Sequence, residues 1–159
     1  MIHGAKMRLV PARDLTYNFD VPAAPAAIYE HLSHAENYVG LSPLVVAVTD
    51  VHTEAGEVRY VAVERFKLGP LKWDNHIRVT MSFPEPGRTL HNDVRSPGWV
   101  HLVSTVTLTP TPTGTQVTEA VHVTYPWLLG TFVVGQATAV QKERAKELIR
   151  RFSALSAEK

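Results

Sequence analysis

Between residues 44 and 125 the sequence alternates between apolar and polar residues, and glycine or proline stands at most of the breaks. Alternation with a period of two is typical of strands that bury one face. The clearest example runs over residues 71–83, where one set of alternate positions is almost entirely apolar. Turn-forming pairs such as Ala55-Gly56 and Gly69-Pro70 separate the strands and favour hairpins. This part of the chain therefore predicts an antiparallel sheet.

Seven strands are expected in total. The first precedes the region just described, at residues 15–21, and ends at Pro22. The other six are expected at residues 45–53, 58–68, 71–83, 89–95, 99–109 and 115–125.

Helical periodicity brackets the strand-rich region. Pro25 favours the first turn of a short helix over residues 25–33, in which Ile28 and Leu32 share one face. A second short helix is expected at residues 35–39. Apolar residues recur at helical spacing from Trp127 onward, which predicts one long helix over residues 127–157.

This order of elements predicts an α+β fold with a long C-terminal helix on an antiparallel sheet. We expect a single domain at residues 14–159, preceded by an arm at residues 1–13. A helix with its side chains is only about 10–12 Å wide, so one helix cannot fill the concave side of a wide sheet. A cavity between sheet and helix is the expected result, and such cavities bind small molecules.

Composition excludes several classes of function. The net charge of +1 gives no basic field, so nucleic acid is not an expected partner. The absence of cysteine excludes disulfides and thiolate chemistry. There are eight histidines, but no three ligands stand at metal-binding spacing, so we expect no metal and no cofactor. No apolar run is long enough to span a bilayer and no secretory signal is recognised, which favours the cytoplasm.

Three parts of the sequence carry a resemblance to a known family: the opening strand and helix at residues 17–29, the hairpin segment at residues 114–118, and the long final helix. They resemble the START/Bet v 1-like (SRPBCC) superfamily of polyketide cyclase/dehydrase and lipid-transport proteins. The resemblance implies a helix-grip fold, in which a curved seven-stranded sheet wraps around the C-terminal helix and encloses a hydrophobic pocket. It also implies a small hydrophobic ligand such as a lipid, a quinone or a polyketide. It carries over no catalytic motif.

Several polar residues interrupt apolar strand faces and are candidates for the pocket lining. Glu64 and Glu119 are the candidate catalytic residues, because a carboxyl that is desolvated in a pocket has a raised pKa and can act as general acid or base. The alternative is that β-bulges turn these side chains toward solvent or toward nearby arginines. The remaining polar candidates for ligand binding are Asn75, Asn92 and Ser104.

Aromatic residues supply further candidates, because tyrosine and tryptophan combine an apolar ring with one polar group. Of the eight tyrosines and tryptophans, Tyr38, Tyr60 and Trp73 are the favoured pocket residues, and the alternative is that they belong to the core.

Three functions remain open at this point. The first is binding of a hydrophobic ligand, and the second is aromatase/cyclase or dehydratase chemistry. The third is a protein–protein role, which an exposed apolar patch would favour. The protein is expected to be a monomer or a homodimer.

Overall fold

The computed structural model describes residues 10–157. The described chain forms seven strands, two α-helices and two short 3-10 helices. The strands are β1 (Ala12–Val21), β2 (Val45–Glu54), β3 (Glu57–Leu68), β4 (Leu71–Glu85), β5 (Thr89–Ser96), β6 (Val100–Thr111) and β7 (Gly114–Thr124). The helices are α1 (Pro25–Leu32), η1 (Ala35–Tyr38), η2 (Trp127–Leu129) and α2 (Gly130–Ala157).

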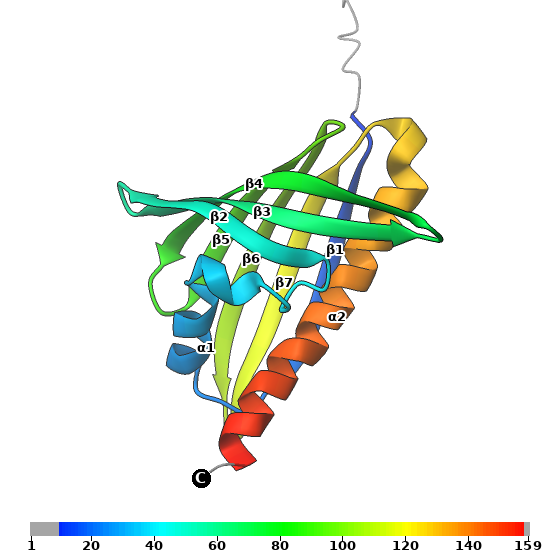
Figure 1. The fold of residues 1–159 in the computed structure, drawn as a ribbon. Coiled ribbons are helices and arrows are strands. Elements are labelled where there is room, and N and C mark those ends of the chain that lie inside the picture. The colour runs from blue at the N-terminus through cyan, green and yellow to red at the C-terminus, as the bar shows by residue number, and fades with distance from the viewer. Residues whose placement is uncertain (1–9, 158–159) are drawn as a thin grey trace, which may run out of the picture.

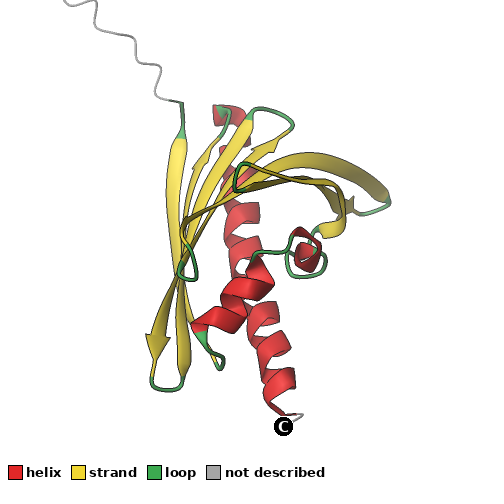
Figure 2. Cartoon of the chain, turned by 90° about the vertical axis from the view of Figure 1, so that its left-hand side faces the viewer, coloured by secondary structure: helices red, strands yellow, loops and turns green. Residues whose placement is uncertain are grey.

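All seven strands form one antiparallel sheet in the order β1-β7-β6-β5-β4-β3-β2. Strands β2 to β7 follow one another by hairpins, whereas β1 crosses to the far edge and pairs with β7. The sheet curves around α2, and α1 with η1 close the concave side near β2 and β6 (Figures 1 and 2). The expected α+β helix-grip fold is confirmed.

The core lies on the concave side of the sheet and is largest toward the C-terminal half of α2. Ile28 and Leu32 of α1 are buried there, as their four-residue spacing predicts, together with Leu148 and Phe152 of α2. A second and smaller cluster surrounds Val123. The N-terminal half of α2 has fewer fully buried side chains than the C-terminal half, which leaves room between this half and the sheet.

The expected element positions are correct to within a few residues, and the long helix shows the largest difference. The chain after Pro126 first makes a 3-10 turn, in which the Leu129 amide donates to the Pro126 carbonyl at 2.8 Å, and α2 begins only at Gly130. A Cβ atom on Gly130 would lie 2.7 Å from Cε2 of Tyr125. The helix therefore starts where a glycine lets it pass over this ring.

The expected arm at residues 1–13 falls largely outside the described residues. Its last two residues, Ala12 and Arg13, already belong to β1 and pair with β7. Within residues 10–157, no helix is both long and apolar enough to cross a membrane.

Candidate functional site

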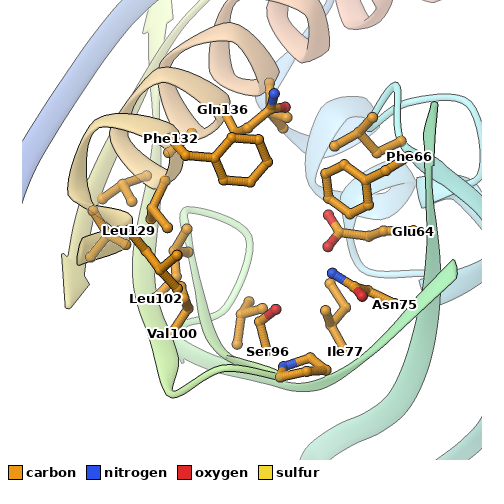
Figure 3. Close-up of a pocket in the computed structure, with 18 of the residues that line it drawn as sticks. Glu64, Phe66, Asn75, Ile77, Ser96, Val100, Leu102, Leu129, Phe132 and Gln136 are labelled. Atoms are coloured by element: carbon orange, nitrogen blue, oxygen red, sulfur yellow. The ribbon is translucent and has the colours of Figure 1, made fainter. Parts of the chain in front are cut away.

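A cavity of about 270 Å³ lies between the N-terminal half of α2 and strands β3 to β7 (Figure 3). This volume is close to the lower end of the range of roughly 300–1,000 Å³ that is common for ligand pockets. Most of the lining is apolar and comes from side chains such as Ile77, Leu102 and Val121 of the sheet and Phe132 and Val140 of the helix. An apolar cavity holds water poorly, so an apolar ligand gains by replacing it.

Five polar side chains contribute to this lining: Glu64, Asn75, Ser96, Gln136 and Arg144. Glu64 of β3 and Asn75 of β4 are directly opposite each other in the sheet register. Both side chains point into the cavity (Figure 3). A ligand in the cavity therefore meets an apolar wall with a small group of hydrogen-bonding atoms on one side.

The position of Glu64 is fixed by an unbroken strand pair. The β3–β4 ladder runs without a register shift from Val58–Met81 to Leu68–Leu71, and in the β2–β3 ladder the extra residue opposite Glu64 belongs to β2, so no bulge in β3 turns Glu64 outward. Glu64 stays on the concave face with Tyr60 and Phe66. The alternative in which a bulge exposes this carboxyl is wrong.

The surroundings of Glu64 favour its neutral form. Burial raises the pKa of the Glu64 carboxyl, and the positive charge of Arg144 only partly offsets this effect. A carboxyl that keeps its proton to higher pH can donate a hydrogen bond to a ligand carbonyl or hydroxyl. Glu64 therefore has the position and the electrostatics of a hydrogen-bond donor or a general acid.

Glu119 is also on the concave face, but it is held by α2. The β6–β7 and β1–β7 ladders pass through Glu119 without a shift, and its side chain is buried. Arg144 donates from Nη2 to Oε1 of Glu119 at 3.3 Å, and Gln141 donates to the Glu119 backbone carbonyl at 3.2 Å. This buried carboxylate therefore has a cationic partner on the helix.

Arg144 stands in a run of charged residues, Lys142-Glu143-Arg144, and yet faces the sheet. The charged run at residues 142–144 reads as a solvated face of the helix, but Arg144 turns inward and lines the cavity. Helical spacing indicates this inward position of Arg144. Val133, Ala137 and Val140 precede it at intervals of three or four residues and line the same cavity.

A second cavity of about 20 Å³ lies deeper under the sheet. Tyr38, Asn92, Ser104 and Glu119 line it, and Arg144 lines both cavities. Among the described residues, Oδ1 of Asn92 and Nε of Arg144 are buried without a hydrogen-bond partner. The volume suits about one water molecule, which would satisfy such atoms.

The predicted aromatic residues lie in three different surroundings. The Tyr38 hydroxyl donates to the Leu32 carbonyl at 2.9 Å, and the Tyr38 and Tyr60 ring centres are 6.3 Å apart. Burial raises the pKa of both phenols, so they remain protonated. Trp73 stacks on Phe66 with ring centres 5.5 Å apart and remains partly exposed. Neither Tyr60 nor Trp73 lines the two cavities just described.

The structure thus separates the candidate residues into groups. Glu64 and Asn75 line the large cavity, whereas Tyr38, Asn92, Ser104 and Glu119 line the small one. The sequence did not single out Phe66, Phe132, Gln136 or Arg144. The sequence does allow Phe66 to be predicted as a pocket residue, because it follows Glu64 by two residues and therefore shares its strand face.

Four of the described histidines, His34, His52, His101 and His122, lie within ion-pairing distance of a carboxylate. His34 lies 2.8 Å from Glu30, and His101 lies 3.0 Å from Asp93. Within the part of the chain that the structure describes, no group of three or more His, Asp and Glu side chains is placed to hold a metal ion.

Similar solved structures share this fold at low sequence identity. The di-domain ARO/CYC StfQ from the steffimycin biosynthetic pathway matches with a TM-score of 0.72 and 12% identity, over 93% of this chain and 52% of that one. The chain thus spans about half the length of StfQ. The Zhui aromatase/cyclase from Streptomyces sp. R1128 matches with a TM-score of 0.67 and 15% identity, over 89% and 96% of the two chains.

A third structure, TTHA0849 from Thermus thermophilus, matches with a TM-score of 0.69 and 19% identity, over 92% and 99% of the two chains. No curated protein sequence matches the chain significantly. The family described as polyketide cyclase/dehydrase and lipid transport matches residues 12–153, which is nearly the whole described fold. The resemblance seen in the sequence is confirmed, and the chain belongs to this family.

Proposed function

We propose that this protein binds a small hydrophobic molecule with one polar group, such as a lipid, a quinone or a polyketide, in the cavity between the sheet and α2. The observation that carries the proposal is the lining itself, which is apolar except for a few polar side chains that include Glu64 and Asn75. Burial of the ligand's apolar part supplies the affinity, at about 25 cal/mol per Å² of apolar surface removed from water.

The polar side chains fix the orientation of the ligand. In its protonated form, which burial favours, Glu64 donates to a carbonyl or hydroxyl oxygen, and the Asn75 amide can donate or accept beside it. A ligand that lacks any oxygen leaves these groups without a partner in a largely apolar cavity, which costs binding free energy. The cytoplasm is the compartment proposed for this activity.

The test uses a matched pair of substitutions on α2. Ala137 lines the cavity and Ala139 is exposed on the same helix, so Ala137→Phe fills the cavity and Ala139→Phe does not. We expect Ala137→Phe to weaken binding of the apolar dye Nile red by roughly tenfold or more, which corresponds to about 1.4 kcal/mol. Ala139→Phe should leave it unchanged. Equal affinities in both variants, with the fold intact by circular dichroism, would refute the proposal.

Native mass spectrometry of the purified protein provides the complementary measurement. A ligand bound to the wild-type chain should appear as added mass that is absent from Ala137→Phe. Extraction of that ligand identifies its chemical class.

Acid–base chemistry of the aromatase/cyclase or dehydratase kind is the second candidate function, and the raised pKa of Glu64 favours it. In this scheme the Glu64 carboxyl delivers a proton to an oxygen of a folded polyketide chain. Glu64→Gln should then abolish turnover while Nile red binding persists. Glu119→Gln tests the other predicted carboxyl, whose contact with Arg144 argues for a structural role. Full activity in Glu64→Gln would exclude Glu64 as the acid.

A further inference from the structure

We propose that the surface around the mouth of the large cavity docks on an anionic lipid bilayer. We call this surface the apolar rim, and it consists of Leu68, Leu71, Trp73, Trp99, Trp127 and Leu128. All six side chains are exposed, with Trp99 at 89% and Trp127 at 75%. Large apolar side chains exposed together usually mark an interaction surface.

Three separate segments of the chain form the apolar rim: the β3–β4 turn, the β5–β6 turn, and η2 with the start of α2. The Phe66 and Phe132 ring centres are 6.4 Å apart, which joins the first segment to the third (Figure 3). A Cβ atom on Gly98 would lie 3.8 Å from Cδ1 of Leu129, which joins the second segment to the third. The rim is therefore one surface.

The rim surrounds an opening of the cavity. Phe132 lines the cavity and is nevertheless 53% exposed, so this ring lies between the interior and the solvent. Phe66, Pro97 and Leu129 of the three segments line the same cavity. A hydrophobic molecule that passes between a bilayer and the cavity would contact these apolar side chains at the opening.

The tryptophan side chains of the protein are concentrated on this surface. The chain has three tryptophans, Trp73, Trp99 and Trp127, and all three are in the apolar rim. Tryptophan is enriched where proteins meet the membrane–water interface. Trp99 also has a positive φ of 59°, a conformation that bulky residues rarely adopt. Backbone strain of this kind is found most often at functional sites.

The charges on the three segments complement an anionic surface. Residues 66–73, 96–100 and 125–132 contain two lysines and no acidic residue. Lys67 and Lys72 are directly opposite each other in the β3–β4 register, and two like charges at such positions repel. The nearby Asp74 already has a partner, because Nε and Nη2 of Arg65 donate to its Oδ1 and Oδ2 at 2.9 and 3.2 Å. Lipid phosphates would neutralise the two lysines, whose long stems let the ammonium groups reach the headgroups.

The tryptophans make the test direct, because all of the tryptophan emission of this protein comes from the apolar rim. The probes are vesicles of phosphatidylcholine alone and vesicles of phosphatidylcholine mixed with phosphatidylglycerol. We expect a blue shift of the emission and co-sedimentation of the protein with the mixed vesicles, and much weaker effects with phosphatidylcholine alone. Added salt should reduce both effects, because it screens the lysines.

Two matched pairs of variants locate the contact. Leu128→Ser should weaken co-sedimentation, whereas Leu155→Ser, at an exposed leucine near the other end of α2, should not. Lys67→Glu with Lys72→Glu should reduce partitioning by at least about 25-fold, since each basic residue near such a surface contributes roughly fivefold, or ~1 kcal/mol. Lys142→Glu with Lys146→Glu, on the exposed face of α2, is the charge-matched control.

The proposal is overturned if the wild-type protein binds neither kind of vesicle. It is also overturned if the rim variant and the control variant of each matched pair bind the vesicles equally well. It is also overturned if the emission shifts with protein concentration in the absence of vesicles and the mass doubles, which would assign the rim to a second copy of the chain. Ala137→Phe separates this proposal from the proposed function, because it fills the cavity and leaves the rim residues in place. That variant should still bind mixed vesicles.

Discussion

The guanidinium of Arg144 on α2 lies 3.3 Å from the carboxylate of Glu119 on β7, across the space between helix and sheet. Both side chains are largely buried, and Arg144 also borders the two cavities. This ion pair is therefore both a connection between the helix and the sheet and part of the lining of the site.

Removal of Arg144 should destabilise the fold, because a buried carboxylate without its partner is costly. We expect Arg144→Met to lower the free energy of unfolding by about 3 kcal/mol. The double variant Glu119→Leu/Arg144→Met should recover most of this loss, since neither charge is then left unpaired. Urea denaturation measures all three proteins. Lys146→Met, which breaks the exposed pair with Glu143, is the control and should cost less than about 0.5 kcal/mol.

Glu64 should make stability depend on pH, because its pKa is raised from the ordinary value of 4.5 in the folded state. Below that value the carboxyl is protonated in both states and its contribution to stability is fully present. That contribution is lost as the pH rises through the raised folded pKa, because the unfolded chain gives up its proton first. Relative to Glu64→Gln, the wild-type protein should therefore lose unfolding free energy toward neutral pH. A constant difference across this range would contradict the assignment, and Glu54→Gln on the exposed end of β2 serves as control.

Two glycines of α2 should respond in opposite directions to alanine. Gly135 is exposed and a Cβ atom there meets nothing within 4 Å, so Gly135→Ala should stabilise the helix by roughly 0.8–1.0 kcal/mol. Gly130→Ala places its Cβ atom 2.7 Å from the buried Tyr125 ring and should destabilise the protein. Thermal unfolding followed by circular dichroism gives both values. Stabilisation by Gly130→Ala would mean that the Tyr125 ring moves aside freely.

Arg151 and His31 should make the fold sensitive to acid. Arg151 donates to the carbonyl oxygens of Asn37 at 2.7 Å and Val39 at 3.0 Å, and its Nη1 lies 3.0 Å from Nε2 of His31. Burial, and secondarily the charge of Arg151, lowers the pKa of His31 from 6.5. The stability that neutral His31 provides is present above that value and lost as the pH falls through the lowered folded pKa.

His31→Gln removes this titrating group and should flatten the decline in melting temperature on acidification. The measurement is thermal unfolding of both proteins over the range below pH 6.5, the ordinary pKa of histidine. An equally steep decline in His31→Gln would assign the acid sensitivity to other groups.

The positions of the strands and helices could be predicted because periodicity is a local property of the sequence. The apolar face of β4 and the pair of Ile28 and Leu32 on α1 follow directly from spacings of two and four residues. Even there, α2 begins three residues later than expected, because the start of the helix depends on contact with the Tyr125 ring. Tertiary contacts decide such boundaries.

The site was less predictable than the fold. Glu64 could be singled out because a carboxyl on an apolar strand face is unusual. Arg144 could not, because a charged residue in a charged helical run is normally solvated, and only the packing of α2 on the sheet turns it toward Glu119. The sequence likewise does not show that Trp73 stacks on Phe66 at the surface.

The uneven packing of α2 has a mechanical consequence. Its C-terminal half is clamped by Leu148 and Phe152 in the core and by the Arg151 hydrogen bonds, whereas its N-terminal half spans a cavity. The helix is thus anchored more firmly at its C-terminal end than at its N-terminal end, where Val133 and Val134 pack on the smaller cluster around Val123. A molecule that fills the cavity adds contacts to the N-terminal half and stiffens it. Amide protons near Phe132 should then exchange with solvent more slowly, while those near Phe152 should exchange slowly with or without the ligand.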